Sequence, residues 1–245
     1  MLVFAYVNLI WFLAGLIVGL TSFGGNLFAM PLLALVMPAR DAVVLGCLLF
    51  PAMCVTLTVL YRRAILWREV LVLGLSSGLG IPLGIAFLSR ASSRTILLVA
   101  AFCVFVFLFW QWFATHRKFA ARPLHMGWAV PLGIVSGLMS GATGLGGPPL
   151  AFYALARQWN KESVLGGLSM AAMCSFVFFF PLQWQAGLYT PELLKTSLWS
   201  SAAAILGIFA AMPLLSRINM RLFRALMLGM IALSALLLLV RGLLA

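Results

Sequence analysis

The sequence predicts an all-α polytopic membrane protein made of two inverted repeats, each a re-entrant broken-helix hairpin followed by three full transmembrane helices. The 245 residues are 64% hydrophobic and only 8% charged, with a mean hydropathy of +1.15, which is more apolar surface than a soluble domain can cover. The long apolar runs are leucine-rich and do not alternate, which favours helices over a barrel. Two glycine-rich interruptions occupy matching positions in the two halves, a pattern typical of transport sites.

The first hairpin consists of a long apolar arm over residues 2–21 and a shorter arm over residues 27–37. The eleven residues of the shorter arm reach about 17 Å, roughly half the hydrocarbon thickness. If the long arm crossed the bilayer completely, Arg40 and Asp41 would lie near the bilayer centre, which is costly. We therefore expect a V-shaped hairpin whose tip lies at mid-depth.

Three full spans are expected after the first hairpin, over residues 42–61, 66–88 and 95–115. A basic loop then divides the single membrane domain, residues 1–245, into a first repeat, 1–115, and a second repeat, 126–245. The pattern restarts with a hairpin over 128–156 and spans over 163–182, 193–215 and 222–240. Each half therefore has an odd number of crossings, which inverts the second half relative to the first.

The second hairpin contains the stretch around which the chain is organised. Five glycines are followed there by two prolines: Gly137, Gly141, Gly144, Gly146, Gly147, Pro148 and Pro149. Each glycine costs a helix about 1 kcal/mol, so the chain should break over residues 144–147. Proline is accepted in the first turn of a helix, so the two prolines should begin the next one.

Sequence similarity between the halves indicates a duplication. Val44–Leu48 and Val164–Leu168 share the pattern V-L-G-x-L, and the triplet at 52–54 recurs at 172–174. Both matches have the same offset, 164 − 44 = 172 − 52 = 120. Repeated elements in one order favour duplication over coincidence.

Loop charges favour the inverted arrangement with both termini outside. One predicted face holds eleven of the sixteen Lys and Arg residues: Arg62, Arg63, Arg68, Arg117, Lys118, Arg122, Arg157, Lys161, Arg217, Arg221 and Arg224. The other face holds five: Arg40, Arg90, Arg94, Lys195 and Arg241. Cytoplasmic loops are the more basic, so the net charge of +12 is explained by topology, and no nucleic-acid partner is expected.

The hairpin tips are predicted to bind a small anion. Glycines allow an oxyanion to approach backbone N–H groups at a helix start, where the helix dipole is positive. The predicted binding residues are Ser22, Gly24, Gly25, Asn26, Ser140, Thr143, Gly144, Gly146 and Gly147. The alternative, tight helix packing, is favoured for the pairs Gly15-xxx-Gly19 and Gly137-xxx-Gly141.

The remaining polar residues give little support to an enzyme. Asp41, Glu69, Glu162 and Glu192 lie near span starts, where we expect them to complement helix dipoles. The cysteines are expected to be buried, without metal or disulfide, and Gln111, Gln183 and Gln185 to face water. The alternative function, an integral membrane enzyme acting on a lipid or a sulfur compound, would have to use His116 or His125, which have no evident acidic partner.

The chain resembles the TauE/SafE family of sulfite and organosulfonate exporters over essentially its whole length. The resemblance rests on Phe23-Gly24-Gly25-Asn26 with Pro31, and on the run from Gly144 to Pro149. It implies export of a small sulfur-containing anion, such as sulfite or sulfoacetate, across a bacterial inner membrane, without ATP hydrolysis or a redox cofactor. Asn26 and Pro148 stand where the family often has a third glycine, and this leaves the substrate open. Membrane lipid is the expected surrounding partner, and a homodimer is compatible with the sequence.

Overall fold

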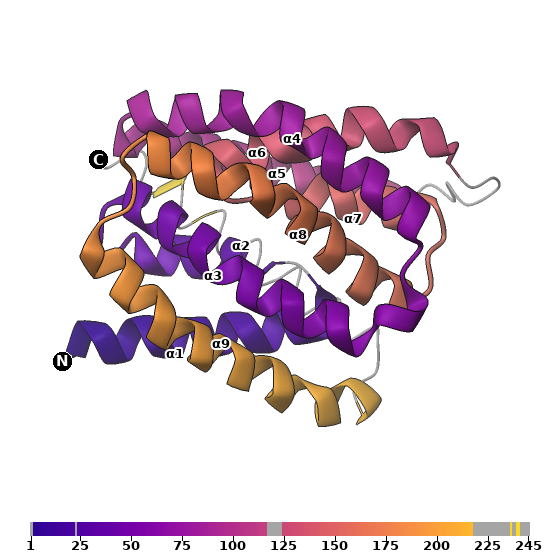
Figure 1. The fold of residues 1–245 in the computed structure, drawn as a ribbon, viewed down its shortest axis with the longest axis horizontal. Coiled ribbons are helices and arrows are strands. Elements are labelled where there is room, and N and C mark those ends of the chain that lie inside the picture. The colour runs from indigo at the N-terminus through magenta and orange to yellow at the C-terminus, as the bar shows by residue number, and fades with distance from the viewer. Residues whose placement is uncertain (1, 23, 117–123, 218–235, 237–238, 241–245) are drawn as a thin grey trace.

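The structure, a computed structural model, describes residues 2–22, 24–116, 124–217, 236 and 239–240. All regular elements in this part of the chain are helical (Figure 1). They are α1 (Leu2–Thr21), α2 (Gly25–Leu33), α3 (Ala39–Leu60), η1 (Arg62–Ala64), α4 (Trp67–Arg90), α5 (Ser93–His116), η2 (Met126–Trp128), α6 (Ala129–Thr143), α7 (Gly147–Ala156), α8 (Lys161–Gln185) and α9 (Pro191–Arg217). Most of the predicted span 222–240 lies outside the described residues.

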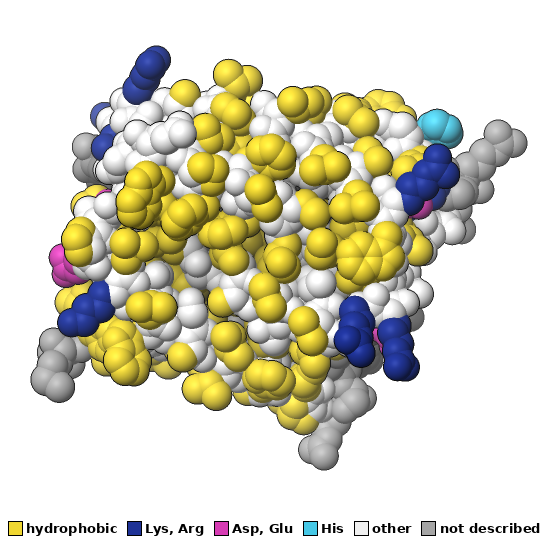
Figure 2. Space-filling view, in the orientation of Figure 1, with side chains coloured by type: hydrophobic (Ala, Val, Ile, Leu, Met, Phe, Trp, Pro, Cys, Tyr) yellow, Lys and Arg dark blue, Asp and Glu magenta, His cyan; other side chains and the backbone are white. Residues whose placement is uncertain are grey.

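Five of these helices are long and apolar enough to cross a membrane, which confirms the all-α, multi-pass class. The candidate spans are Val3–Thr21, Ala39–Leu60, Trp67–Arg90, Lys161–Gln185 and Pro191–Leu214. Figure 2 shows Lys and Arg side chains at two opposite ends of the molecule, with hydrophobic side chains covering the surface between them. This distribution matches a bundle whose middle is in lipid and whose ends are in water.

The two short helices each run back along the helix that precedes them. The Tyr6 hydroxyl, near the start of α1, donates to the Leu32 carbonyl near the end of α2, at 3.3 Å. In the second half, the Leu124 N–H lies just before α6 and donates to the Ala156 carbonyl at the end of α7, at 3.0 Å. Helices of 9 and 10 residues span only about 14–15 Å, so neither is long enough to cross the hydrocarbon.

Helix α4 reaches from one short-helix pair to the other. It begins beside the end of the α6–α7 pair that lies away from its helix break, and it ends beside the corresponding end of the α1–α2 pair. Near its start, Glu69 binds Arg157, which directly follows α7. Just after its end, the Ala91 carbonyl accepts a hydrogen bond from Arg40, which lies between α2 and the body of α3. The α1–α2 and α6–α7 pairs therefore open toward opposite ends of the bundle.

Small residues bring two helix pairs into close contact, as predicted for the Gly15 and Gly137 motifs. A methyl group at Gly15 of α1 would overlap the Ala204 carbonyl of α9. A methyl group at Gly137 of α6 would overlap the Ser77 carbonyl of α4. In each pair, the two helix backbones lie so close together that a side chain would not fit between them. This is the packing mode of small-xxx-small motifs.

Replacing Gly137 with alanine should therefore destabilise the fold by about 1–3 kcal/mol, because the added methyl group pushes α6 away from the α4 backbone. Thermal unfolding of the purified protein in detergent measures the loss. Gly127→Ala is the matched control, since Gly127 is exposed and its nearest neighbour is the movable ring of His125. Equal unfolding temperatures for the two variants would contradict this packing.

Candidate functional site

The first helix break is formed by two residues in the left-handed backbone region. Helix α1 ends at Thr21, and Ser22 has a φ of 66° while Gly24 has a φ of 92°. Ser22 is buried, its N–H donates to the Val18 carbonyl at 2.7 Å, and its hydroxyl donates to the Leu165 carbonyl of α8 at 2.9 Å. These contacts hold a serine in a conformation that usually requires glycine.

The second break is built from a glycine cap and a serine bridge. Gly144 ends α6 with a φ of 72°, and its N–H donates to the Ser140 carbonyl at 2.7 Å. The Ser136 hydroxyl donates to the Gly146 carbonyl at 2.6 Å, which ties the last residues before α7 to the body of α6. Both breaks therefore occur where glycine and proline chemistry predicts them.

The two helix starts differ in the number of N–H groups they offer. The first helical hydrogen bond of α2 runs from the Phe28 N–H to the Gly24 carbonyl, so the N–H groups of residues 25–27 have no partner within the helix. Helix α7 begins at Gly147, and the next two residues are Pro148 and Pro149, which have no N–H. The helix start at α2 is consequently the richer in donors, so the two breaks are not chemically equivalent.

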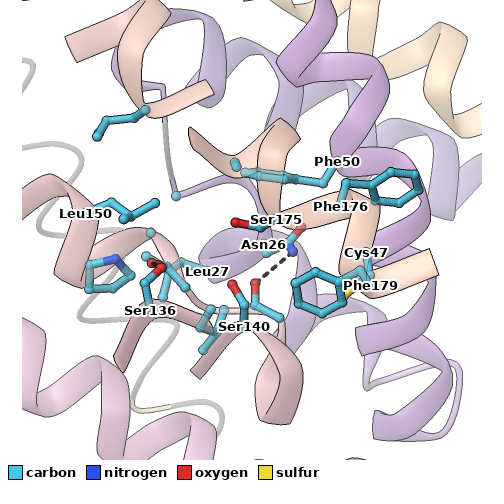
Figure 3. A pocket seen from close by; sticks show the side chains of 18 of the residues that line it. Asn26, Leu27, Cys47, Phe50, Ser136, Ser140, Leu150, Ser175, Phe176 and Phe179 are labelled. Carbon is cyan, nitrogen blue, oxygen red and sulfur yellow. Dashed lines mark hydrogen bonds between the residues drawn. The ribbon is translucent and has the colours of Figure 1, made fainter. Parts of the chain in front are cut away.

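One side chain joins the two breaks. The Asn26 side chain, in the first turn of α2, donates from Nδ2 to the Gly144 carbonyl at 2.9 Å (dashed in Figure 3). The two residues are 118 positions apart. The two predicted binding segments thus meet in space.

A pocket lies where the breaks meet (Figure 3). Its cavity volume is about 60 Å³, counting only the positions that the centre of a water molecule could occupy. One water needs about 10–15 Å³ of such space, so the cavity has room for a small oxyanion. The described residues that line it include no Asp, Glu, Lys, Arg or His: Ser22, Gly24, Asn26, Leu27, Cys47, Phe50, Pro51, Ser136, Ser140, Gly144, Leu145, Gly146, Gly147, Pro148, Leu150, Leu168, Ala172, Ser175, Phe176 and Phe179.

Seven of the nine predicted residues line this pocket: Ser22, Gly24, Asn26, Ser140, Gly144, Gly146 and Gly147. The other two are placed elsewhere. Gly25 packs against α1, where an added methyl group would lie 2.6 Å from Val18 Cγ2. The Thr143 hydroxyl donates to the Met139 carbonyl at 2.9 Å within α6. Neither Gly25 nor Thr143 is among the described residues that line the pocket.

Several lining residues were not singled out from the sequence. Ser136 and Ser175 add hydroxyls, and Phe50, Phe176 and Phe179 form an aromatic part of the wall. All of them lie within apolar runs, where a serine or phenylalanine is ordinarily a packing residue. Their position in the wall follows from how α3, α6 and α8 meet, which has no local sequence signal.

The prediction that Gln183 faces water is wrong. Gln183 is fully buried, and its Oε1 accepts a hydrogen bond from the Tyr189 hydroxyl at 2.9 Å. Burial raises the pKa of Tyr189, so its hydroxyl keeps the proton that it donates. Gln185 is exposed as predicted, and the side chain of Gln111 lies outside the described residues.

A polar cluster at the far end of α7 anchors this helix to α4. Glu69 accepts from Arg157 Nη2 at 2.5 Å and Nε at 2.9 Å, from the Tyr153 hydroxyl at 2.8 Å and from Trp159 Nε1 at 3.3 Å. The hydrogen bond to Glu69 raises the pKa of Arg157, so the guanidinium keeps its charge. Glu69 therefore has a structural partner, beyond the helix-dipole role expected of it.

The described residues contain no group of His, Cys, Asp and Glu suited to a metal ion. Cys47, Cys54, Cys103 and Cys174 are free, and the first two are buried. His125 is exposed, and its Nδ1 accepts the Gly127 N–H at 3.1 Å. None of these side chains is part of a metal site within the described residues.

A comparison with family models supports the resemblance seen in the motifs. The model described as "Sulfite exporter TauE/SafE" matches residues 7–238, nearly the whole chain. No match was found among curated proteins or among solved structures.

Proposed function

Because the chain belongs to the sulfite exporter TauE/SafE family, we propose that it is a secondary transporter that exports a small sulfur-containing anion, sulfite or an organosulfonate. Its expected location is a bacterial inner membrane. The pocket between the two helix breaks is the proposed substrate site. The observation that carries this proposal is the Asn26 to Gly144 hydrogen bond, which joins both breaks beside one cavity.

We propose that the two halves are inverted repeats, 1–115 and 126–245, with α1–α2 and α6–α7 as re-entrant hairpins. The opposite openings of the two helix pairs support this, as does the pairing of helices. The first arm of each hairpin packs on the second long helix of the other half: α1 on α9, and α6 on α4. A two-fold axis in the membrane plane would relate these two contacts.

The pocket chemistry supports an anion as the ligand. The N–H groups at the start of α2 and the Ser140 hydroxyl, which no described residue engages, are donors beside the cavity. The positive end of the α2 dipole adds to their attraction. Three aromatic side chains and several aliphatic ones exclude water from the rest of the wall, which strengthens these interactions.

The membrane potential is a sufficient driving force for export. An anion leaving a cell that is negative inside gains about 2.3 kcal/mol per charge for each 100 mV. No additional coupling ion is needed for a net outward flux. The protein's task is then to provide a low-barrier path with a specific binding step.

Purified protein in vesicles held about 100 mV positive inside should accumulate a monovalent sulfur anion roughly 50-fold. Radiolabelled sulfite uptake measures this, with protein-free vesicles as the control. A thermal-shift series with sulfite, thiosulfate, sulfoacetate, taurine and plain carboxylates then ranks the ligands. If none of the sulfur anions is transported, the proposed function is wrong.

A further inference from the structure

The serine hydroxyls of the pocket leave one hydroxyl donor for a ligand. Three of the four serines in the described lining already donate to backbone carbonyls: Ser22, Ser136 and Ser175. A hydroxyl has a single hydrogen to donate, so these three are occupied. The fourth, Ser140, has no partner among the described residues, and its Oγ lies against Gly146, where an added methyl group would overlap it. Hydroxyl donation to an anion is therefore confined to the part of the pocket beside the second helix break.

Another part of the wall is aromatic. It consists of Phe50 on α3 and of Phe176 and Phe179 on α8. Phe176 and Phe179 are three residues apart, so they lie on the same side of α8. Figure 3 shows Phe50 and Phe176 apart from Ser140, which comes from α6. The pocket thus has a polar end beside Ser140 and an aromatic end formed by these three phenylalanines.

The aromatic end has nothing to compensate a charge. The described lining residues include no acidic and no basic side chain. A carboxylate placed there would lose its hydration and face the negative faces of the rings. An ammonium is attracted to those faces, but this attraction is weaker than the cost of taking the ion out of water. A ligand group at the aromatic end is therefore favourable only if it is uncharged and apolar.

Building on the proposed function, we infer that the pocket selects a sulfonate with a single negative charge and an uncharged, apolar tail. The sulfonate oxygens accept from the Ser140 hydroxyl and from the N–H groups at the start of α2, and the tail packs against the aromatic end. Sulfite, which has no tail, occupies only the polar end. Taurine and sulfoacetate bind poorly, because each brings a second charge, an ammonium or a carboxylate, to the aromatic end.

The first test compares two ligands of the same shape, taurine and propane-1-sulfonate, in which an ammonium and a methyl group replace each other. Both are tested at neutral pH as competitors of radiolabelled sulfite uptake by wild-type protein in vesicles. Propane-1-sulfonate should halve the uptake at a concentration at least about 100-fold below that of taurine, because the ammonium must be desolvated. Equal or stronger competition by taurine would overturn this inference and leave sulfite export intact.

A binding measurement separates this inference from the proposed function. Thermal shifts of the purified protein rank the same two ligands without any transport. If propane-1-sulfonate stabilises the protein more than taurine does while no sulfite enters the vesicles, the selectivity stands and sulfite transport is refuted. If neither ligand shifts the unfolding temperature and no sulfite enters, both are refuted.

The second test locates the tail. Methane-, ethane- and propane-1-sulfonate should compete at concentrations that fall about fourfold with each added methylene, which is the effect of burying one such group. In Phe50→Ala and in Phe176→Ala the fall should be no more than about twofold per methylene, because part of the apolar wall is gone. The series is compared within each variant, so a change in the absolute rate of uptake does not affect it.

Phe102→Ala is the matched control for both variants. Phe102 is exposed on α5 and is not among the described residues that line the pocket, so this variant should keep the fourfold series. A flat series in the wild type would overturn the inference. A fourfold trend that persists in both pocket variants would also overturn it, because the tail would then lie away from the aromatic end. The wild-type series and the taurine comparison stand even where a variant does not fold.

Discussion

Replacing Gly146 with valine is expected to reduce sulfite flux in proteoliposomes by at least about 100-fold, because it moves both sides of the second helix break. A side chain at Gly146 would overlap the Ser140 hydroxyl and lie 2.7 Å from the Ser136 carbonyl oxygen. Ser140 could rotate away, but the carbonyl belongs to the α6 backbone. The start of α7 would therefore be displaced from the pocket that it lines.

The displacement should spread to the first break as well. The Ser136 hydroxyl bond to the Gly146 carbonyl lies next to Gly144, which accepts the Asn26 hydrogen bond. Moving residue 146 would alter both contacts, and with them the position of Asn26 relative to the cavity. A substitution in one half thus affects donors contributed by the other.

Gly127→Val is the matched control for this experiment. It is the same substitution at an exposed position, where the closest neighbour is the His125 ring at 3.1 Å. This variant should transport normally. Size-exclusion profiles and unfolding temperatures must show that Gly146→Val is folded before its flux is interpreted. A folded Gly146→Val protein with wild-type flux would refute the site assignment.

The helix breaks could be predicted from the sequence because their causes are local. Glycine tolerates the left-handed conformation seen at Gly24 and Gly144, and proline is accepted in the first turn of α7 at Pro148. The long helices are equally local, because an apolar run in lipid must satisfy its own hydrogen bonds. Predicted and observed bounds of the described spans accordingly differ by only a few residues.

Long-range pairing could not be predicted in this way. Glu69 and Arg157 are 88 residues apart, and nothing in either segment identifies the other as its partner. Gln183 near a helix end has the sequence pattern of a water-facing residue, yet the loop residue Tyr189 folds back onto it. Such contacts depend on how helices are arranged in three dimensions, which hydropathy and turn chemistry do not specify.

The Glu69 cluster connects these long-range contacts to the proposed transport site. Helix α7 starts at the pocket and ends beside Arg157, so the cluster holds one end of the helix whose other end lines the cavity. The Arg157 guanidinium also donates to the Leu124 carbonyl, which ties the approach to α6 into the same cluster. A carboxylate at one position thereby fixes both arms of the α6–α7 pair.

Glu69→Gln should lower the free energy of unfolding by about 2–3 kcal/mol. Removing one partner of a buried ion pair costs about 3–5 kcal/mol, and partial exposure of the Arg157 side chain, 24%, reduces this value. Chemical denaturation in detergent measures the change. Arg157→Met should have a similar cost, because among the described residues it leaves the Glu69 carboxylate with only Tyr153 and Trp159 as donors.

The double variant Glu69→Gln, Arg157→Met should be less destabilised than the sum of the two single losses, since no charge is left unpaired. Glu162→Gln is the control: it also removes a carboxylate from the first turn of a long helix, but Glu162 is exposed. Its cost should stay within about 0.5 kcal/mol. If Glu69→Gln behaved like Glu162→Gln, the cluster would not anchor α7, and the end of that helix would have to be held by its apolar contacts alone.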